Sequence, residues 1–328
     1  MSNVLSANSV VYSLPGSDVF HKAVAKSVDP SPSAGTKSFV LRPFAQNASP
    51  FFFSMDADEP VDVGNLEVML PDYTAKLTAV DRKAYIQKVE KAIEQCQAMN
   101  GKIVLSRSIE VPMRTLNIGN SLISLRARYP QAFVYLLNSH SHGIWMGASP
   151  EVLLEKEEGM YATMALAGTK WGDALFEQKE FDEQLTVARY ILAQLEDAVV
   201  EVSDMYEHPF GALRHLRTDF RWEDEREALE FAERLHPTPA VCGFPLERAM
   251  NFIQEVEGYN RSLYAGYLGI VDSNENAHLF VNLRCMQLFR DRVLVYVGGG
   301  INALSDPEVE WEETEKKKES VLSALHYE

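Results

Sequence analysis

The spacing of apolar residues along the chain predicts helices and strands that alternate irregularly. Before about residue 78 we expect only short strands broken by turns. From Asp81, apolar positions at helical spacing predict a helix that Asp81 caps and that Asn100-Gly101 ends. Thr115 is expected to cap a second helix that ends near Tyr129. Further helices are predicted over Leu175–Asp204, Glu225–Leu235, Pro245–Glu257 and from Asp306-Pro307 to the end of the chain.

Runs rich in β-branched and aromatic residues predict the strands. These runs are 102–107, Phe133–Leu137, Ile144–Met146, Val152–Glu155, Met160–Leu166, Leu213–Phe220, Tyr264–Val271, His278–Phe289 and Val293–Val297. Strands often follow one another through short turns, which favours antiparallel pairing over a doubly wound parallel sheet. We therefore predict an α+β protein in which helices pack outside antiparallel sheets.

Composition narrows the class of protein. The 328 residues are 46% apolar and 24% charged, which excludes a disordered or fibrous chain. A net charge of −16 repels nucleic acid and anionic lipid, so neither is expected as a partner. The chain has neither an apolar run of about 18 residues nor a secretory-type start. Its three cysteines, Cys96, Cys242 and Cys285, suggest a cytoplasmic protein without disulfides or zinc, and we expect a monomer.

Two acidic pairs are candidates for chemistry. Glu180 and Glu183 lie early in one predicted helix, and Glu310 and Glu313 lie early in the last one. The i,i+3 spacing places both carboxylates of a pair on one helical face. Acids in a first turn also simply complement the helix dipole. The functional alternative is that the two faces meet and hold Mg²⁺ through oxygen ligands, and spacing alone does not decide between these interpretations.

Five further positions have both a structural and a functional interpretation. Gly298–Gly300 after an apolar strand form either a tight turn with positive φ or a cradle for an anion. Lys102 and Glu151 are either solvent-facing charges or a general base and a general acid. Arg284 inside an apolar run needs an anionic partner, which is either structural or a ligand. His215 is more typical of a hydrogen-bonded structural histidine.

Taken together, these residues belong to a series of motifs. The chain resembles the chorismate-binding enzymes, a family that contains isochorismate, salicylate, anthranilate and aminodeoxychorismate synthases. The resemblance runs in order over about residues 80–325, and its motifs are GKIVLSR (101–107), GASPEVLLE (147–155), ALAGTK (165–170), KEFDEQ (179–184), HPTPAVCGFP (236–245), LYAGYLG (263–269), VNLRCM (281–286), GGGI (298–301) and EWEETEKK (310–317).

The resemblance implies a fold and a set of roles. It implies a single domain over 1–328, with a variable N-terminal segment, 1–78, and a motif-bearing core, 79–328, built from two packed, mainly antiparallel sheets with helices outside. It implies a Mg²⁺-dependent pocket for chorismate, with Glu183 and Glu313 as direct metal ligands and Glu180 and Glu310 as their water-linked neighbours. The residues that it implies for substrate binding are Gly168, Thr169, His215, Ala240, Tyr264, Arg284, Gly298, Gly299, Gly300 and Lys317.

The same resemblance implies the reaction. Lys102 and Glu151 match the base and acid of the members that use water. Attack of water at C2 of chorismate with loss of the C4 hydroxyl gives isochorismate, and this reaction needs a base on one face and an acid on the other. Glu151 must be protonated to serve as the acid, so we predict that its pKa is raised.

Single residues distinguish the members of the family. Lys102 favours water over the ammonia used by anthranilate synthases, and Ala167 replaces the lysine nucleophile of aminodeoxychorismate enzymes. Ala240 favours release of isochorismate over the salicylate alternative, in which pyruvate is then eliminated. Two features depart from the family pattern: Gln184 follows Glu183 where histidine is usual, and the segment after Trp171 is short. Neither feature decides between a menaquinone and a siderophore pathway.

Overall fold

The protein is an α+β structure in which strands form the interior. The computed structural model describes residues 4–32, 35–73, 81–172, 174–210, 213–272 and 276–327. Within these ranges the helices are α1 (Arg82–Met99), α2 (Ile118–Arg128), α3 (Gln178–Gln194), α4 (Ala228–Leu235), α5 (Leu246–Val256) and α6 (Pro307–Leu322). No helix in the described ranges has the length and apolar character needed to cross a membrane.

Two large sheets contain nearly all the strands, and every pairing between named strands in the described residues is antiparallel. The nine-stranded sheet has the order β16 (Gly243–Phe244), β7 (Lys102–Pro112), β20 (Arg292–Ile301), β19 (Cys285–Leu288), β10 (Gly143–Ser149), β9 (Phe133–Ser139), β1 (Ser9–Ser13), β2 (His21–Val24), β6 (Glu59–Pro60). The ten-stranded sheet has the order β13 (Glu201–Val202), β15 (Leu213–Glu223), β12 (Met160–Trp171), β11 (Val152–Glu157), β18 (Ala277–Val281), β17 (Tyr267–Val271), β4 (Lys37–Arg42), β5 (Phe51–Met55), β3 (Ser27–Asp29), with β14 (Tyr206–Phe210) beside β15. A two-stranded sheet joins β8 (Leu116–Asn117) to β21 (His326–Tyr327). The predicted α+β architecture of antiparallel sheets is confirmed.

The first 60 residues complete one edge of both large sheets. Strands β1, β2 and β6 extend the nine-stranded sheet, whereas β3, β4 and β5 extend the ten-stranded one. This stretch of the chain is therefore built into the same two layers as the rest. The division into a variable segment, 1–78, and a core, 79–328, stays a prediction.

The core lies between the sheets and extends under one helix. Phe133 on β9 stacks on Phe280 of β18 with ring centroids 4.5 Å apart, which joins the facing sheets. Val134 and Leu136 on the other face of β9 pack instead in the cluster that includes Leu122 of α2. The alternation along β9 follows the two-residue period of a strand.

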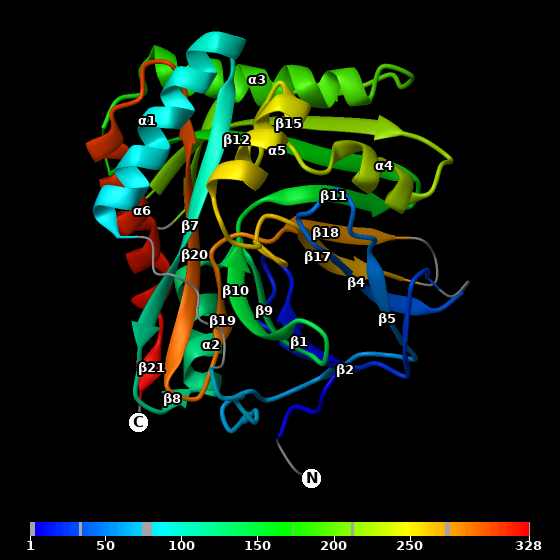
Figure 1. Ribbon diagram of the computed structural model, residues 1–328. Helices are drawn as coiled ribbons and strands as arrows, with labels where there is room; N and C mark the ends of the chain where they lie inside the picture. The colour runs from blue at the N-terminus through cyan, green and yellow to red at the C-terminus, as the bar shows by residue number, and fades with distance from the viewer. Residues whose placement is uncertain are drawn as a thin grey trace.

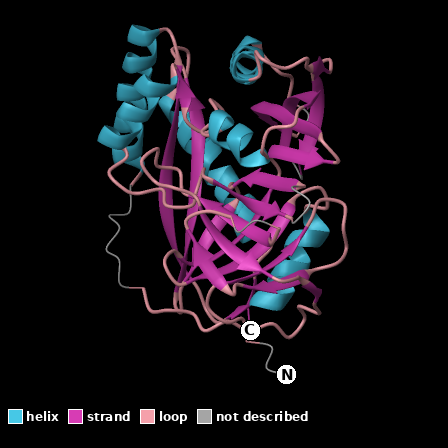
Figure 2. Cartoon of the chain, turned by 90° about the vertical axis from the view of Figure 1, so that its right-hand side faces the viewer, coloured by secondary structure: helices cyan, strands magenta, loops and turns pink. Residues whose placement is uncertain are grey.

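The helices cover the strands from outside. Helices α1 and α6 lie along the long β7–β20 pair, and α3 lies over β12 and β15 (Figure 1). A view turned by 90° shows strands through the centre of the molecule, with most helical segments toward its margins (Figure 2). Glu180 and Glu310 come from the first turns of α3 and α6, so the packing of these two helices decides where the acidic pairs lie.

Several helix boundaries differ from the predictions. Helix α4 begins at Ala228 rather than Glu225, and α6 ends at Leu322 rather than at the end of the chain. Asn117, not Thr115, caps α2, because its side chain accepts a hydrogen bond from the Asn120 backbone N–H. The predicted helix Leu175–Asp204 is shorter in the structure, where α3 spans Gln178–Gln194. The valine-rich segment that follows favours extended backbone, and β13 forms there. The predicted starts at Asp81 and Asp306-Pro307 are confirmed, since both aspartates cap their helices.

Two strand predictions are also corrected. Gly298–Gly300 do not form a turn with positive φ but continue β20, where they pair with Val104–Ser106 of β7. The predicted strand His278–Phe289 is two strands, β18 in the ten-stranded sheet and β19 in the nine-stranded sheet. The chain passes from one sheet to the other at 282–284, where Arg284 adopts a φ of 50°.

Candidate active site

The predicted site residues come together in one cleft. It holds about 940 Å³ of atom-free space, counted out to its open mouth. Every residue implied by the family resemblance lines it except Glu310. The structure thus gathers residues from 102 to 317 in one place, while their chemical roles stay predictions. The lining comprises Lys102, Val104, Pro150, Glu151, Leu166, Ala167, Gly168, Thr169, Lys179, Glu180, Glu183, His215, Ala240, Val241, Tyr264, Leu283, Arg284, Tyr296, Val297, Gly298, Gly299, Gly300, Glu313 and Lys317.

Glu151 and Arg284 occupy two neighbouring crossings between the sheets. Glu151 lies where the chain leaves β10 and enters β11, and Arg284 lies where it leaves β18 and enters β19. Backbone hydrogen bonds join the crossings: Val281 N–H donates to Glu151 O at 3.0 Å, and Ala148 N–H donates to Arg284 O at 3.1 Å. Both functional side chains are therefore placed by rigid backbone.

Glu151 has the environment of a general acid. It is 4% exposed, and burial raises its pKa to about 8, although the positive charge of Lys102 opposes the shift. The predicted raised pKa is confirmed in direction. Burial penalises the ionised form, so the carboxyl keeps a proton at neutral pH and can donate it.

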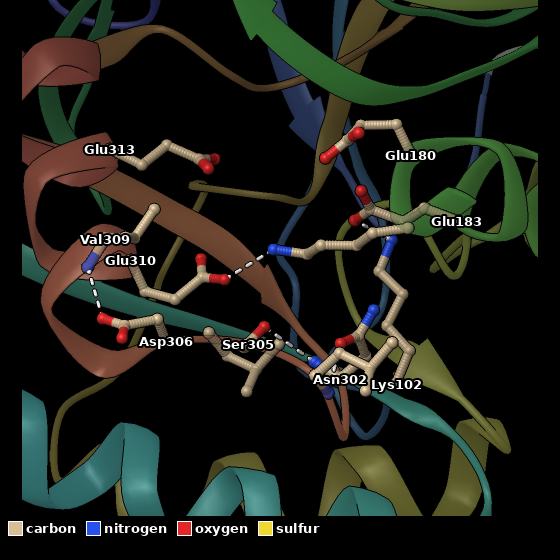
Figure 3. A network of polar contacts seen from close by, with 12 residues as sticks. Lys102, Glu180, Glu183, Asn302, Ser305, Asp306, Val309, Glu310 and Glu313 are labelled. Carbon is tan, nitrogen blue, oxygen red and sulfur yellow. Dashed lines mark hydrogen bonds and ion pairs between the residues drawn. The ribbon is translucent and has the colours of Figure 1, made fainter. Parts of the chain in front are cut away.

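Lys102 begins β7 and its side chain is 8% exposed. Its Nζ lies 2.6 Å from Glu183 Oε1. Lys102 is therefore not an edge charge in solvent but a buried residue whose amino group lies beside Glu183 (Figure 3), and it lines the same cleft as Glu151. Gly300 leaves room for this contact, because a Cβ on residue 300 would collide with Glu183 Oε1 and with Lys102 Cε.

Gly168 and Thr169 form a bulge in β12 opposite His215 of β15. Gly168 adopts a φ of +72°, and a Cβ there would lie 2.7 Å from the backbone oxygen of Glu180. Thr169 Oγ1 lies 3.1 Å from His215 Nδ1. Burial lowers the pKa of His215 well below its usual range, so the imidazole is neutral. Its Nε2 is buried and has no hydrogen-bond partner in the described residues.

The opposite wall carries aromatic and cationic groups. Tyr264 stacks on Tyr296 with ring centroids 5.4 Å apart, and burial raises the pKa of Tyr264. Arg284 donates to Ser320 Oγ at 3.1 Å, and burial lowers the pKa of its guanidinium. Lys317 of α6 donates to Gly298 O at 2.9 Å. Arg284 and Lys317 are thus two partly buried cations beside a glycine-lined strand, a suitable environment for a carboxylate.

The four glutamates face one another from two helices. Glu180 and Glu183 project from the start of α3, and Glu310 and Glu313 project from the start of α6 toward them (Figure 3). Glu180 also has a structural role, because its Oε2 accepts from the Glu177 N–H at 2.8 Å and closes the capping box of α3. The structure therefore shows a structural role for Glu180, and its role near a metal ion stays a prediction.

Each glutamate has a lysine partner. The distances from Nζ to the carboxylate are 3.2 Å for Lys170–Glu180, 2.6 Å for Lys102–Glu183, 2.7 Å for Lys179–Glu310 and 2.5 Å for Lys317–Glu313. Burial and the charge of Glu313 raise the pKa of Glu310, whereas Lys317 lowers that of Glu313 against the effect of burial. The acidic charge of the site is thus balanced locally.

The donor set has the chemistry that Mg²⁺ requires, since carboxylate oxygens are its usual protein ligands. Glu310 Oε2 is buried without a hydrogen-bond partner in the described residues, which leaves an unsatisfied acceptor at the site. Gly299 keeps that space open, because a Cβ there would lie 3.1 Å from this oxygen and 3.7 Å from Glu313 Oε1. In the described ranges no three acidic, histidine or cysteine side chains are grouped closely enough to hold a metal ion. The glutamates pair with lysines instead.

Sequence reasoning did not identify two lysines of the site. Lys170 directly follows the AGT run, and Lys179 begins the KEFDEQ motif. The sequence pattern predicts a role only for the two glutamates of that motif. The signal for Lys179 is its place in the first turn of a helix, where a basic residue opposes the dipole. Gln184 is fully buried and donates to Thr218 Oγ1 at 2.7 Å.

Comparison with known proteins identifies the family. Residues 65–326 match the family model described as chorismate binding enzyme. Isochorismate synthase EntC of Escherichia coli K12 is 29% identical over 274 residues, which cover 76% of this chain and 70% of EntC. The salicylate biosynthesis isochorismate synthase of Pseudomonas aeruginosa is 30% identical over 267 residues, covering 76% of this chain and 56% of that protein.

A solved structure shows the same fold. MenF, the menaquinone-specific isochorismate synthase from Escherichia coli, superposes with a TM-score of 0.82 at 19% identity, over 98% of this chain and 90% of MenF. At this identity the likeness concerns the fold alone. The match over residues 65–326 covers most of the sequence, and on that ground the chain belongs to the chorismate-binding enzyme family.

Proposed function

We propose that this protein is an isochorismate synthase that isomerises chorismate with Mg²⁺. The observation that carries the proposal is the buried pair of Lys102 and Glu151 in one cleft, with a Glu151 pKa of about 8. A base and a protonated acid are what addition of water and departure of hydroxide require. The similarity to EntC, an isochorismate synthase that is 29% identical to this chain, supports the same activity.

The reaction balances without an external oxidant or reductant. Water forms a bond from its oxygen to C2 of chorismate while Lys102 takes its proton. The ring double bonds shift, and the C4–oxygen bond breaks as Glu151 gives its proton to the leaving hydroxide. Glu151 must be protonated before each turnover. One water enters and one leaves, so substrate and product are isomers.

The remaining groups bind the dicarboxylate substrate. Arg284 and Lys317, which line the cleft, would supply positive charge for one carboxylate, and the neutral His215 and Tyr264 would contact the ring. Mg²⁺, held by Glu183 and Glu313 with Glu180 and Glu310 behind them, would supply the positive charge for the other carboxylate.

Two alternatives remain within the same fold. A salicylate synthase would eliminate pyruvate after isochorismate forms, and Ala240 at the cleft wall argues against it. An anthranilate-synthase-like aminase would use ammonia, which Lys102 argues against. A monomer acting in the cytoplasm, in a menaquinone or a siderophore pathway, completes the proposal.

The test is product analysis. Protein is incubated with chorismate and either Mg²⁺ or EDTA, and the products are separated by chromatography. We expect isochorismate only with Mg²⁺ and no pyruvate. Lys102→Ala and Glu151→Gln should abolish turnover, whereas Glu157→Gln, an exposed glutamate of the neighbouring strand β11, should not. Salicylate with pyruvate would establish the first alternative, and turnover by Lys102→Ala would refute the assignment of the base.

A further inference from the structure

Lys179 joins the two halves of the acidic site. It lies in the first turn of α3, and its Nζ donates to Glu310 Oε1 of α6 at 2.7 Å. The side chain of Glu310 is 1% exposed and that of Lys179 is 25% exposed. This ion pair spans 131 residues of sequence and links the helices from which all four glutamates project.

The position of Lys179 is unfavourable for α3 itself. The positive end of the helix dipole lies at the first turn, where acids stabilise and lysines destabilise. The gain therefore comes from the partner across the site and not from the helix. Lys317, by comparison, pairs with Glu313 four residues away on its own helix.

Glu310 is only half satisfied by this contact. Its Oε1 accepts from Lys179, while its Oε2 is buried and has no partner in the described residues. A buried carboxylate with a free acceptor is costly, which makes the remaining contact from Lys179 important for keeping the Glu310 side chain in place.

We propose that Lys179 is a built-in counter-cation: it holds the α6 carboxylates toward α3 before a metal ion binds, and its charge weakens the binding of that ion. This inference rests on the proposed Mg²⁺-dependent function. A cation beside the carboxylates competes with Mg²⁺ for their negative charge, and the competition is reciprocal, so bound metal weakens the Lys179–Glu310 contact equally. The site stays assembled in either condition.

The test measures metal binding directly. Wild-type protein, Lys179→Met and Lys179→Arg are freed of metal with EDTA and dialysed at about pH 8, well above the ordinary pKa of glutamate. Mg²⁺ alone is then titrated by calorimetry. We expect Lys179→Met to bind Mg²⁺ about tenfold more tightly than wild type, within the usual range of coupling between sites. Lys179→Arg, which keeps the charge, should bind like wild type.

Thermal unfolding in EDTA gives the second measurement. Without metal, the Tm of Lys179→Met should be lower than that of wild type. Saturating Mg²⁺ should raise the Tm of this variant by more than it raises the Tm of wild type. If Lys179→Met does not fold in EDTA, Lys179→Gln, which keeps a donor but no charge, replaces it with the same expectation. A role in packing alone would weaken Mg²⁺ binding, so equal or weaker binding by the neutral variants overturns the inference. Failure of the wild type to bind Mg²⁺ would instead overturn the proposed function.

Discussion

Replacing Glu151 by glutamine should change how stability depends on pH. The folded protein raises the pKa of this carboxyl from 4.5 to about 8 by burial. The unfolded chain therefore loses its proton first as pH rises. The Glu151 carboxyl makes its full contribution to the free energy of unfolding below pH 4.5. This contribution is lost between about pH 4.5 and 8, because the unfolded state binds fewer protons than the native state in that range.

The size of the effect follows from the shift. One pKa unit is worth about 1.4 kcal/mol, so a shift from 4.5 to about 8 corresponds to about 5 kcal/mol, of which about 3 to 4 kcal/mol falls between pH 5 and 8. The glutamine side chain of the variant does not titrate. The free energy of unfolding of Glu151→Gln relative to wild type should therefore rise by about 3 to 4 kcal/mol from pH 5 to pH 8.

Urea denaturation in EDTA at both pH values measures this difference. Glu157→Gln is the matched control, since its side chain is 71% exposed on the adjoining strand β11. Its exposed ion pair with His278 is worth at most about 1 kcal/mol, so its relative stability should change by less than that with pH. The same pKa predicts that kcat/KM of the wild type falls as pH rises through about 8, when the acid loses its proton. A relative change under about 1 kcal/mol between the two pH values would refute a strongly raised pKa.

Three further substitutions test the geometry of the cleft. Gly300→Ala places a methyl group against Glu183 and Lys102, so Mg²⁺-dependent turnover should fall by at least about tenfold while circular dichroism stays native. Gly168→Ala combines a φ of +72° with a 2.7 Å approach to a backbone oxygen, and its unfolding free energy should fall by about 2 kcal/mol or more. Arg284→Gln should raise KM for chorismate by about 10- to 100-fold, the value of one charge-assisted hydrogen bond, and an unchanged KM would remove Arg284 from the carboxylate site.

Sequence patterns predicted the elements better than their connections. The caps at Asp81 and Asp306 act locally, and so both helix starts were predictable from a few residues. The end of α3 was not, because a heptad-like apolar pattern continues past Gln194 while the valines that follow prefer extended backbone. After Gln194 the preference of valine for extended backbone conflicts with the helical spacing of the apolar residues. The sequence alone does not predict which of the two determines the structure.

The site shows the same limit more clearly. A run such as FVNLRCM has the composition of one strand, and nothing in its period reveals that its two ends lie in different sheets. That crossing is what places Arg284 in the cleft. The Lys179–Glu310 contact cannot be predicted from the sequence either, since it depends on how α3 and α6 pack rather than on either motif. The individual acids were identified from local spacing, but their lysine partners were not.

The two halves of the site are held by different kinds of structure. Glu151 and Arg284 are fixed by neighbouring strand crossings that hydrogen-bond to each other, so their positions follow from backbone alone. The glutamates of α3 and α6 are held by side-chain ion pairs, which reorganise at lower cost than a sheet. Under the proposed function, a divalent cation would therefore displace lysine partners from the glutamates while Glu151 and Arg284 stay in place. This division predicts that substitutions among the lysines change metal affinity first, and that substitutions at the crossings change catalysis or folding first.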